Sequence, residues 1–173
     1  MNFIPGSYNP GLLGKNYDAS RLMMVLHFSD SRAPIPHEEE GYREALLASQ
    51  TGRVLKWILE ESKISLDDLF VTNYVKGILP DDKPPTKQEY DVSKPLLLEQ
   101  IELYQPKKIV LFGAPVYSHF FEDTSAFQEV TYSVREFDHI PVLVSEHPGY
   151  IHRLLTEKRK ERISLLSSFL TNN

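Results

Sequence analysis

The most informative absence in this 173-residue chain is cysteine, which does not occur at all. Without a thiol the protein can form no disulfide scaffold, no thiolate nucleophile, no cysteine-ligated zinc site and no cysteine-held iron–sulfur cluster. A chain without cysteine suits a reducing compartment, so we expect a cytoplasmic protein, although the absence is compatible with other compartments.

Long hydrophobic runs and an excess of positive charge are also missing. No stretch of about 18 consecutive apolar residues occurs, which argues against a membrane span. The N-terminus lacks the basic-then-apolar order of a secretory signal. The formal net charge of −5 argues against a general nucleic-acid coat, because such proteins usually carry a basic excess. A local basic groove is compatible with this total.

The composition indicates a globular protein. Hydrophobic residues make up 41% of the chain, which is too many for a disordered protein, and 8 Gly with 12 Pro form no fibrous pattern. A length of 173 residues fits a single domain over residues 1–173. We expect this domain to be a monomer.

Short, continuous apolar runs are typical of strands buried on both faces of a parallel sheet. Four such runs predict strands at residues 22–26, 69–72, 107–113 and 141–144. Because helical segments separate them, the strands should be joined by right-handed crossovers. The sequence therefore predicts an α/β fold, a three-layer α/β/α sandwich with a central, mainly parallel four-stranded sheet.

Hydrophobic periodicity predicts the helices that cover this sheet. They lie at about residues 47–60, 89–104 and 115–121, and in the C-terminal segment around residues 163–170. Composition predicts irregular structure elsewhere, as a lead-in over residues 1–20 and as loops over residues 30–41 and 78–87.

Each predicted strand ends in a distinctive group. His27 and Asp30 follow the first strand, Asn73 the second, Gly113 the third and His147 the fourth. In open α/β sheets, ligands bind outside the carboxyl ends of the strands, so these groups should converge on one edge. Singly, each is typical of a turn or cap. Together, an amide that donates and accepts beside an imidazole suits recognition of a nucleobase edge.

Two segments resemble known motifs. Residues Val71–Gly77 look like the middle of a uracil-DNA glycosylase, closest to the bacterial and archaeal branch that normally carries an iron–sulfur cluster. Residues Glu146–Arg153 are similar to that superfamily's second motif, a His-Pro-Ser stretch followed by an apolar residue and an arginine. The resemblance runs from about Leu22 to the C-terminus and implies the superfamily's three-layer fold and a role in base excision repair. The first block is followed in order by Glu89, Pro95-Leu96, Glu99-Gln100-Ile101, Pro106-Lys107-Lys108-Ile109-Val110 and Gly113.

The chain departs from this family at the cluster. Family members with a cluster carry cysteine where this chain has Gly77 and Ser93. The resemblance therefore implies a member without the cluster, and we expect no metal ion or redox cofactor.

A second departure concerns the first motif, a Gly-Glu-Ala-Pro-Gly-like turn in this branch. Residues 27–34 take its place, and no glycine there lets the backbone approach a base closely. The family's catalytic acid has no clean counterpart, so Asp30 is the first candidate and Glu38 or Glu39 the alternative. Residues 6–11 look like the Asn-Pro-Gly version of the motif in mismatch-specific relatives. They precede the first strand, and we interpret that match as chance.

The resemblance implies a mechanism in which the target base is extruded from DNA. His147 would donate to the uracil oxygen as negative charge develops, and Asn73 would pair with the uracil edge. Asp30 would position water and stabilise the positively charged sugar, while Phe28 or Tyr42 could stack on the flipped base. Each of these residues has an ordinary structural alternative as a cap, a turn residue or a loop residue.

The same resemblance suggests a surface that binds DNA. Tyr150 and Ile151 are candidates for insertion into the duplex, with Arg153 and Lys76 contacting phosphates. Alternatively, Ile151 and Leu154 begin the last helix and pack inward. The acidic total predicts weak, salt-sensitive binding of uracil-containing or damaged DNA.

We therefore predict a uracil-DNA glycosylase-like protein that hydrolyses the N-glycosidic bond of uracil or of a related deaminated base. Two other hypotheses stay open. The chain could be a catalytically inactive member that binds a nucleobase, a nucleotide or a protein partner, as the altered first motif and the acidic charge favour. It could also remove a different damaged base.

Overall fold

The computed structural model describes residues 8–30, 39–80 and 83–172. A sheet of six strands forms the middle layer, in the order β1-β4-β2-β6-β8-β7. Its four middle strands are parallel and are β4 (Leu69–Asn73), β2 (Leu22–Leu26), β6 (Lys108–Phe112) and β8 (Ile140–Ser145). The edge strands β1 (Leu12–Leu13) and β7 (Val134–Phe137) run antiparallel to their neighbours.

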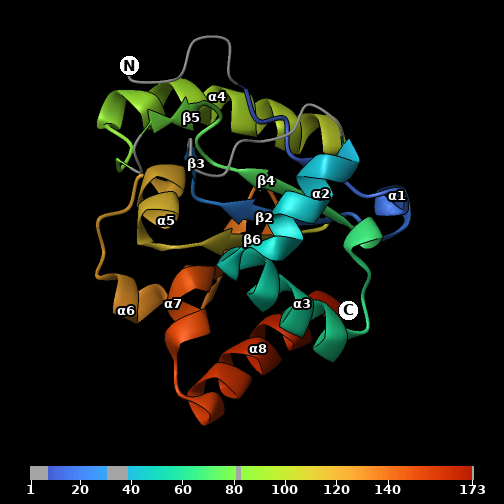
Figure 1. Cartoon of the computed structure of the whole chain (residues 1–173). Helices are drawn as coiled ribbons and strands as arrows, with labels where there is room; N and C mark the ends of the chain where they lie inside the picture. The colour runs from blue at the N-terminus through green and yellow to red at the C-terminus, as the bar shows by residue number, and fades with distance from the viewer. Residues whose placement is uncertain (1–7, 31–38, 81–82, 173) are drawn as a thin grey trace.

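Helices cover both faces of this sheet, as Figure 1 shows with the sheet between two helical layers. One layer contains α2 (Glu39–Ala48), α3 (Gln50–Ser62), α7 (Pro148–Arg153) and α8 (Thr156–Thr171). The other contains α1 (Tyr17–Ser20), α4 (Lys87–Tyr104) and α5 (Ala114–Phe121). The predicted three-layer α/β/α sandwich is therefore confirmed, as are its four parallel strands.

The continuous apolar runs arise because both faces of the parallel strands are buried. Along β2, Leu22 and Met24 pack with the α3 and α8 layer, whereas Met23 and Val25 pack with the α4 and α5 layer. Every residue of β2 is buried. Side chains that alternate between two cores must all be apolar, which is why the strand has no polar alternation.

The edge strands were not predicted, because a two-residue strand leaves little periodic signal. The expectation of an irregular lead-in over residues 1–20 is wrong where β1 and α1 form. The loop predicted over residues 78–87 contains the short strand β5 (Ile78–Leu79), which pairs with β3 (Ser29–Asp30) in a separate two-stranded sheet. This pairing joins the segments that follow β2 and β4.

The helix predicted over residues 47–60 is two helices that meet at Ser49. The Ser49 side chain accepts a hydrogen bond from the Gly52 backbone N–H at 2.9 Å and so caps α3. Gly52 is required at this junction, since a Cβ atom there would lie 2.0 Å from the carbonyl oxygen of Leu46. Within the described ranges, no helix is both long enough and apolar enough to cross a membrane.

Candidate active site

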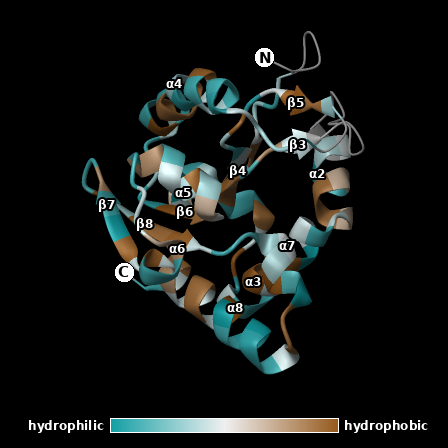
Figure 2. Cartoon of the chain, turned by 90° about the vertical axis from the view of Figure 1, so that its left-hand side faces the viewer, coloured by the Kyte–Doolittle hydropathy of each residue, from teal (hydrophilic) through white to brown (hydrophobic). Residues whose placement is uncertain are grey.

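A cavity of about 600 Å³ opens at the carboxyl ends of the parallel strands. Figure 2 faces this side of the molecule, where α5, α6 (Phe127–Val130) and α7 lie towards the viewer. The residues that line it follow three of the strands or come from the helices beside them. They are His27, Gly113, Ala114, Pro115, Phe127, Gln128, Thr131, Tyr132, Glu146, His147, Tyr150 and Arg162. The predicted convergence of strand ends at one edge therefore places His27, Gly113 and His147 around one space.

Gly113 shapes the wall between β6 and α5. Its φ angle of +103° lies in the region that favours glycine, and its N–H donates to the carbonyl oxygen of Ser145 at 2.7 Å. A Cβ atom at this position would lie 3.7 Å from Cβ of His147. The glycine thus makes a tight turn out of β6 and leaves the space beside His147 open.

His147 presents a defined tautomer to the cavity. It is the N-cap residue of α7, and its Nδ1 accepts a hydrogen bond from the Gly149 N–H at 3.1 Å. Because Nδ1 is an acceptor, a neutral His147 carries its proton on Nε2. Partial desolvation, together with the positive charge of Arg153, lowers the pKa of His147. The imidazole is therefore a neutral N–H donor at physiological pH.

A second imidazole, that of His27, lies opposite His147. The two ring centres are 6.4 Å apart. Nε2 of His27 is hydrogen-bonded to the hydroxyl of Tyr90, a buried residue of α4. Burial, with smaller contributions from His147 and His119, lowers the pKa of His27 to about 4, so this ring is also neutral at physiological pH. The sequence predicted that His27, as a strand end, lies at this edge of the sheet, but it assigned no role to the side chain.

Glu146 and Arg162 form a third part of the wall. Nε of Arg162 lies 3.4 Å from Oε2 of Glu146, and the same oxygen accepts a hydrogen bond from the Tyr132 hydroxyl at 2.9 Å. The Arg162 guanidinium also stacks over the Tyr132 ring at 4.7 Å. Glu146 is thus a paired carboxylate, and Arg162, from the expected basic region, is largely neutralised.

Asn73 lies at the same edge of the sheet, at the end of β4, but does not line the cavity formed by the described residues. Its side chain is buried, and its Nδ2 donates to Oγ of Ser29 at 2.6 Å. The strand ends stay together beyond the sheet, since the Val75 N–H donates to the carbonyl oxygen of His27 at 3.1 Å. Oδ1 of Asn73 accepts no hydrogen bond from the described part of the chain.

Asn9, whose motif the sequence analysis interpreted as a chance match, lies beside Asn73 at this edge of the sheet. It is 0% exposed, and its Nδ2 donates to the same Ser29 hydroxyl at 3.2 Å, while its Oδ1 accepts from the Gly11 N–H at 2.9 Å. Because β1 runs antiparallel to β4, the residues before β1 return to the carboxyl end of β4. The Asn-Pro-Gly segment at residues 9–11 therefore lies next to Asn73, although it precedes the first parallel strand.

The two candidates for stacking on a base lie near this edge. Phe28 is half-buried and contacts His27 edge to face, with ring centres 4.7 Å apart. The Tyr42 hydroxyl lies 3.4 Å from Nδ2 of Asn9, and its ring packs against the α3 and α8 layer. Neither residue lines the 600 Å³ cavity formed by the described residues. Phe28 is the nearer of the two to the imidazole pair.

Two candidates for DNA contact lie in the interior instead. Lys76 is 2% exposed, and its Nζ donates to Oγ1 of Thr72 at 2.7 Å and to Oε1 of Gln100. Ile151 is 0% exposed in the core beneath α3 and α8. A buried ammonium or isoleucine side chain cannot reach a duplex outside the protein, so the geometry argues against both contacts. For Ile151 the alternative of inward packing is the observed one.

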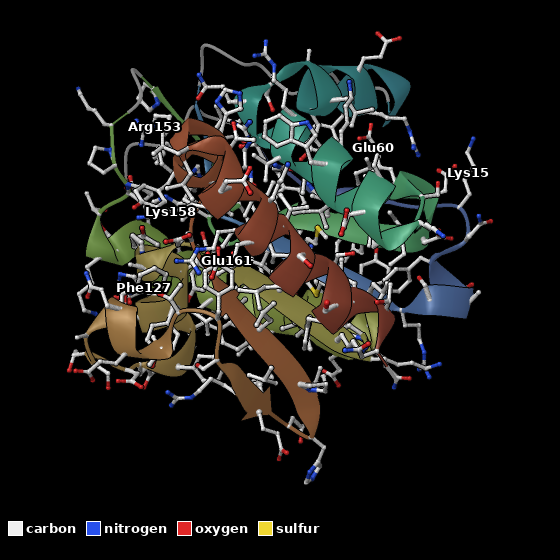
Figure 3. The ribbon with its side chains drawn as sticks, turned by 90° about the horizontal axis from the view of Figure 1, so that it is seen from below. Lys15, Glu60, Phe127, Arg153, Lys158 and Glu161 are labelled. Atoms are coloured by element: carbon white, nitrogen blue, oxygen red, sulfur yellow. The ribbon has the colours of Figure 1, made fainter. Side chains whose placement is uncertain are left out.

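The segment expected to be a loop after His147 is the helix α7, and it leaves other residues on the surface. Tyr150 is 48% exposed at the cavity, and Arg153 is exposed at the end of α7. Leu155, which sequence reasoning did not single out, is 79% exposed between α7 and α8. Figure 3 shows Arg153 and Lys158 on the side of the molecule where Phe127 lies.

The expected catalytic acid cannot be placed from the described residues. Asp30 belongs to β3 by its backbone, which pairs with Leu79, but its side chain lies outside the described part. Glu38 also lies outside the described residues, as does the side chain of Glu39 at the start of α2. Among the described residues that line the cavity, Glu146 is the one carboxylate, and it is paired with Arg162.

The residues present do not fit an iron–sulfur cluster. The chain has no cysteine, and Ser93, at one of the expected cluster positions, is buried and accepts a hydrogen bond from the Lys76 N–H at 3.2 Å. Gly77, at the other, has no side-chain ligand. In the described ranges, no group of three or more His, Asp or Glu side chains is arranged to hold a metal ion.

The fold and the site define a class of protein: a three-layer α/β/α domain with a ligand cavity at the carboxyl edge of its parallel sheet. The sequence of residues 13–169 matches the family described as the Uracil DNA glycosylase superfamily. Because this match covers most of the chain, the protein belongs to that superfamily, and the resemblance seen in the sequence is confirmed.

Curated relatives point to the same branch. The chain is similar to the Type-4 uracil-DNA glycosylase of Thermotoga maritima, with 31% identity over 121 residues, which is 68% of this chain and 62% of the relative. It is also similar to the Type-4 enzymes of Pyrobaculum aerophilum, at 31% over 81 residues (47% of this chain, 40% of the relative), and of Sulfurisphaera tokodaii, at 30% over 101 residues (58% and 43%). The matches thus span less than two thirds of each relative's length.

Proposed function

We propose that this protein hydrolyses the N-glycosidic bond of uracil, or of a related deaminated base, in DNA. The observation that carries the proposal is the neutral His147, whose Nε2–H faces a cavity at the carboxyl edge of the sheet. Family membership and the Type-4 relatives support uracil as the first base to test. A cavity of about 600 Å³ has room for an extruded nucleotide, since small-molecule sites span roughly 300–1,000 Å³.

His147 would act on the leaving base. Cleavage of the C1′–N1 bond leaves negative charge on the pyrimidine, and a fixed N–H donor at its O2 oxygen stabilises that charge. A neutral imidazole also keeps positive charge away from a sugar that is itself becoming positive. Losing one such donor typically lowers a rate by about 10²–10³-fold.

Asn73 would recognise the base edge. One of its amide hydrogens is bound to Ser29, which leaves Oδ1 and the second hydrogen for a ligand. Uracil offers a matching pair, because its N3–H donates and its O4 accepts. Cytosine has an acceptor at N3 and an amino group at C4, so the same amide orientation disfavours it. Phe28, beside His27, is the nearer candidate for stacking on the base.

A carboxylate would stabilise the positively charged sugar, and Asp30 is our first candidate, with Glu38 or Glu39 as the alternative. On the surface, Tyr150 would contact the displaced strand and Arg153 a phosphate. With a net charge of −5, and with the cavity-lining Arg162 paired with Glu146, DNA affinity should be weak and should fall with added salt. The cytoplasmic location and the monomeric state stay predictions.

Cleavage of defined oligonucleotides tests the function. The protein is incubated with single- and double-stranded oligonucleotides that carry uracil, hypoxanthine or xanthine, and abasic sites are then cleaved with alkali. We expect strand breaks at uracil with the wild type and not with His147→Ala. If a folded wild type cleaves none of these substrates, the proposed function is wrong.

The second candidate is a protein that binds a nucleobase without cleaving the bond. It is favoured by the state of Glu146, the one carboxylate among the described residues that line the cavity, which is paired with Arg162 and Tyr132. Tight binding of a uracil oligonucleotide without cleavage would support this candidate.

A further inference from the structure

His27 is a half-buried titratable group of the cavity for which the mechanism above has no use. It follows β2 directly, lines the cavity and faces His147. Its ring is fixed by the hydrogen bond between Nε2 and the Tyr90 hydroxyl and by the edge-to-face contact with Phe28. A ring held on two sides in this way points its remaining nitrogen in one direction.

That remaining nitrogen, Nδ1, has no hydrogen-bond partner among the described residues. Because His27 lines the cavity, a small molecule such as water that occupies the cavity can approach this ring. When Nε2–H donates to the Tyr90 oxygen, Nδ1 carries a lone pair and can accept a proton.

The two imidazoles border the same space, since both rings line the cavity and their centres are 6.4 Å apart. A group that acts on a bound nucleotide has to come within about 2.6–3.2 Å of the atom on which it acts, so candidates for proton transfer are the side chains that line this space. His147 already has the donor suited to the leaving base, which leaves the attacking water to His27.

We propose that His27, oriented by Tyr90, is the catalytic residue on the water side and accepts the proton of the water that attacks C1′ of the extruded nucleotide. This inference rests on the proposed function. In the step, the C1′–N1 bond breaks with both electrons passing to the base, and the water oxygen bonds to C1′. The water proton moves to Nδ1 of His27 and then to solvent, and the base anion takes a proton from solvent.

Electrostatics favour this assignment. The groups facing His27 are the hydroxyl of Tyr90 and the imidazoles of His119 and His147, and burial with these rings keeps His27 uncharged above a pKa of about 4. An uncharged base does not oppose the positive charge that develops on the sugar. Weak basicity suffices here, because a sugar with carbocation character needs little activation of the water.

Single-turnover cleavage of a uracil oligonucleotide tests the assignment with His27→Phe. Phenylalanine keeps an aromatic ring against Phe28 and Tyr90 but has no nitrogen. We expect the rate to fall by about 100-fold or more, as for loss of a general base. Affinity for an oligonucleotide carrying uncleavable 2′-fluoro-deoxyuridine should change by less than about 3-fold. A merely structural role of His27 would lower the cleavage rate and the affinity together.

Two further variants sharpen the test. Tyr90→Phe removes the orienting hydroxyl and should lower the rate by about 10-fold, again with little change in affinity. His152→Phe is the matched control, because His152 stacks on Trp57 without lining the cavity, and its rate should stay within about 3-fold. The melting temperature of each variant checks its folding.

The outcomes separate the two proposals. A wild type that cleaves, with His27→Phe of unchanged rate, overturns the role of His27 and leaves the proposed function standing. Equal losses of rate and affinity in His27→Phe assign His27 to structure and also overturn the proposal. A proton on Nδ1 in the histidine ¹⁵N spectrum at neutral pH does the same. A wild type that cleaves no substrate overturns both.

Discussion

Two groups of side chains at the carboxyl edge of the sheet, the β8 wall that lines the cavity and the β4 wall that lies beside it, are built in different ways. The β8 wall takes His147, Glu146 and Tyr150 from one short segment, with Nδ1 of His147 held by Gly149 two residues away. The β4 wall is assembled from three distant segments, where Asn9 and Asn73 both donate to the Ser29 hydroxyl. The β8 wall is partly exposed and local in sequence, whereas the β4 wall is buried and long-range.

This difference predicts whether substitutions in each wall affect function alone or function and stability together. A local, exposed group can be removed without disturbing the core, so its loss affects function alone. A buried hydrogen-bonded group leaves unsatisfied partners behind, so its loss costs stability as well. Four predictions follow from this contrast, in order of decreasing effect.

His147→Ala should lower single-turnover cleavage of uracil DNA by about 10²–10³-fold, because the fixed Nε2–H donor is lost. Its free energy of unfolding should stay within about 0.5–1 kcal/mol of the wild type, since the side chain lies at the surface. His152→Ala is the control from the same helix, because His152 stacks on Trp57 rather than lining the cavity. Unchanged cleavage in His147→Ala would show that the site is misplaced.

Asn9→Ala should affect both properties. It removes one donor to Ser29 and the acceptor for the Gly11 N–H inside a buried region, which should lower the free energy of unfolding by about 1–3 kcal/mol. Because Ser29 also holds Asn73, we expect cleavage to fall by about 10-fold. Urea unfolding and single-turnover rates measure the two effects. Asn16→Ala is the control, since Asn16 is exposed and makes no capping hydrogen bond.

Lys76 gives the β4 wall a stability that depends on pH. Burial lowers the pKa of Lys76 from 10.5 to about 7. Between pH 7 and pH 10.5 the unfolded chain carries a proton on Lys76 that the folded protein lacks, so the free energy of unfolding rises with pH over this range. The gain in stability is complete above pH 10.5 and is lost as pH falls through 7. The free energy of unfolding should rise by about 1–2 kcal/mol from pH 7 to pH 9.

Urea unfolding at both pH values checks this expectation. Lys76→Met should abolish the rise because it removes the titrating group, whereas Lys56→Met, at an exposed position of α3, should retain it. An equal rise in wild type and Lys76→Met would contradict the assignment.

The smallest effect is expected on the surface beside the β8 wall. Replacing Arg153 and Lys158 together with alanine should weaken DNA binding by about 3- to 10-fold and reduce its dependence on salt concentration by up to about two counterions. Lys15→Ala is the control, because Figure 3 shows Lys15 on the opposite side of the molecule. Equal losses in both proteins would place DNA elsewhere.

Much of the fold could be predicted from local pattern. The run Leu22–Leu26 is continuously apolar because the strand is buried on both faces, against a hydrophobic core on each side of the sheet. The short edge strands could not be predicted from such a pattern, because β1 has two residues and β7 alternates between exposed and half-buried side chains. Ser49 divides a long helical pattern through one capping hydrogen bond, which periodicity alone does not show.

The candidate site was predictable only in part. His147 and Gly113 follow strands that the pattern identifies, so their position at the edge could be inferred. Lys76 and Ile151 were expected at the surface, yet both are buried, because burial depends on segments far away in the sequence. The Lys76 side chain, for example, is held by Gln100 of α4.

The three-layer fold, the parallel strands and the superfamily follow from the sequence, because apolar runs, helical periodicity and motif residues are properties of neighbouring positions. The sequence also predicted that His27 and His147 lie at one edge of the sheet, but the contact of Asn9 with Ser29 and the 6.4 Å spacing of the two imidazole rings are known from the structure alone. Those contacts join segments that are distant in the sequence and that meet through the order of the strands and the antiparallel pairing of β1 with β4. Strand order and strand direction cannot be recognised from the residue types of the neighbouring positions.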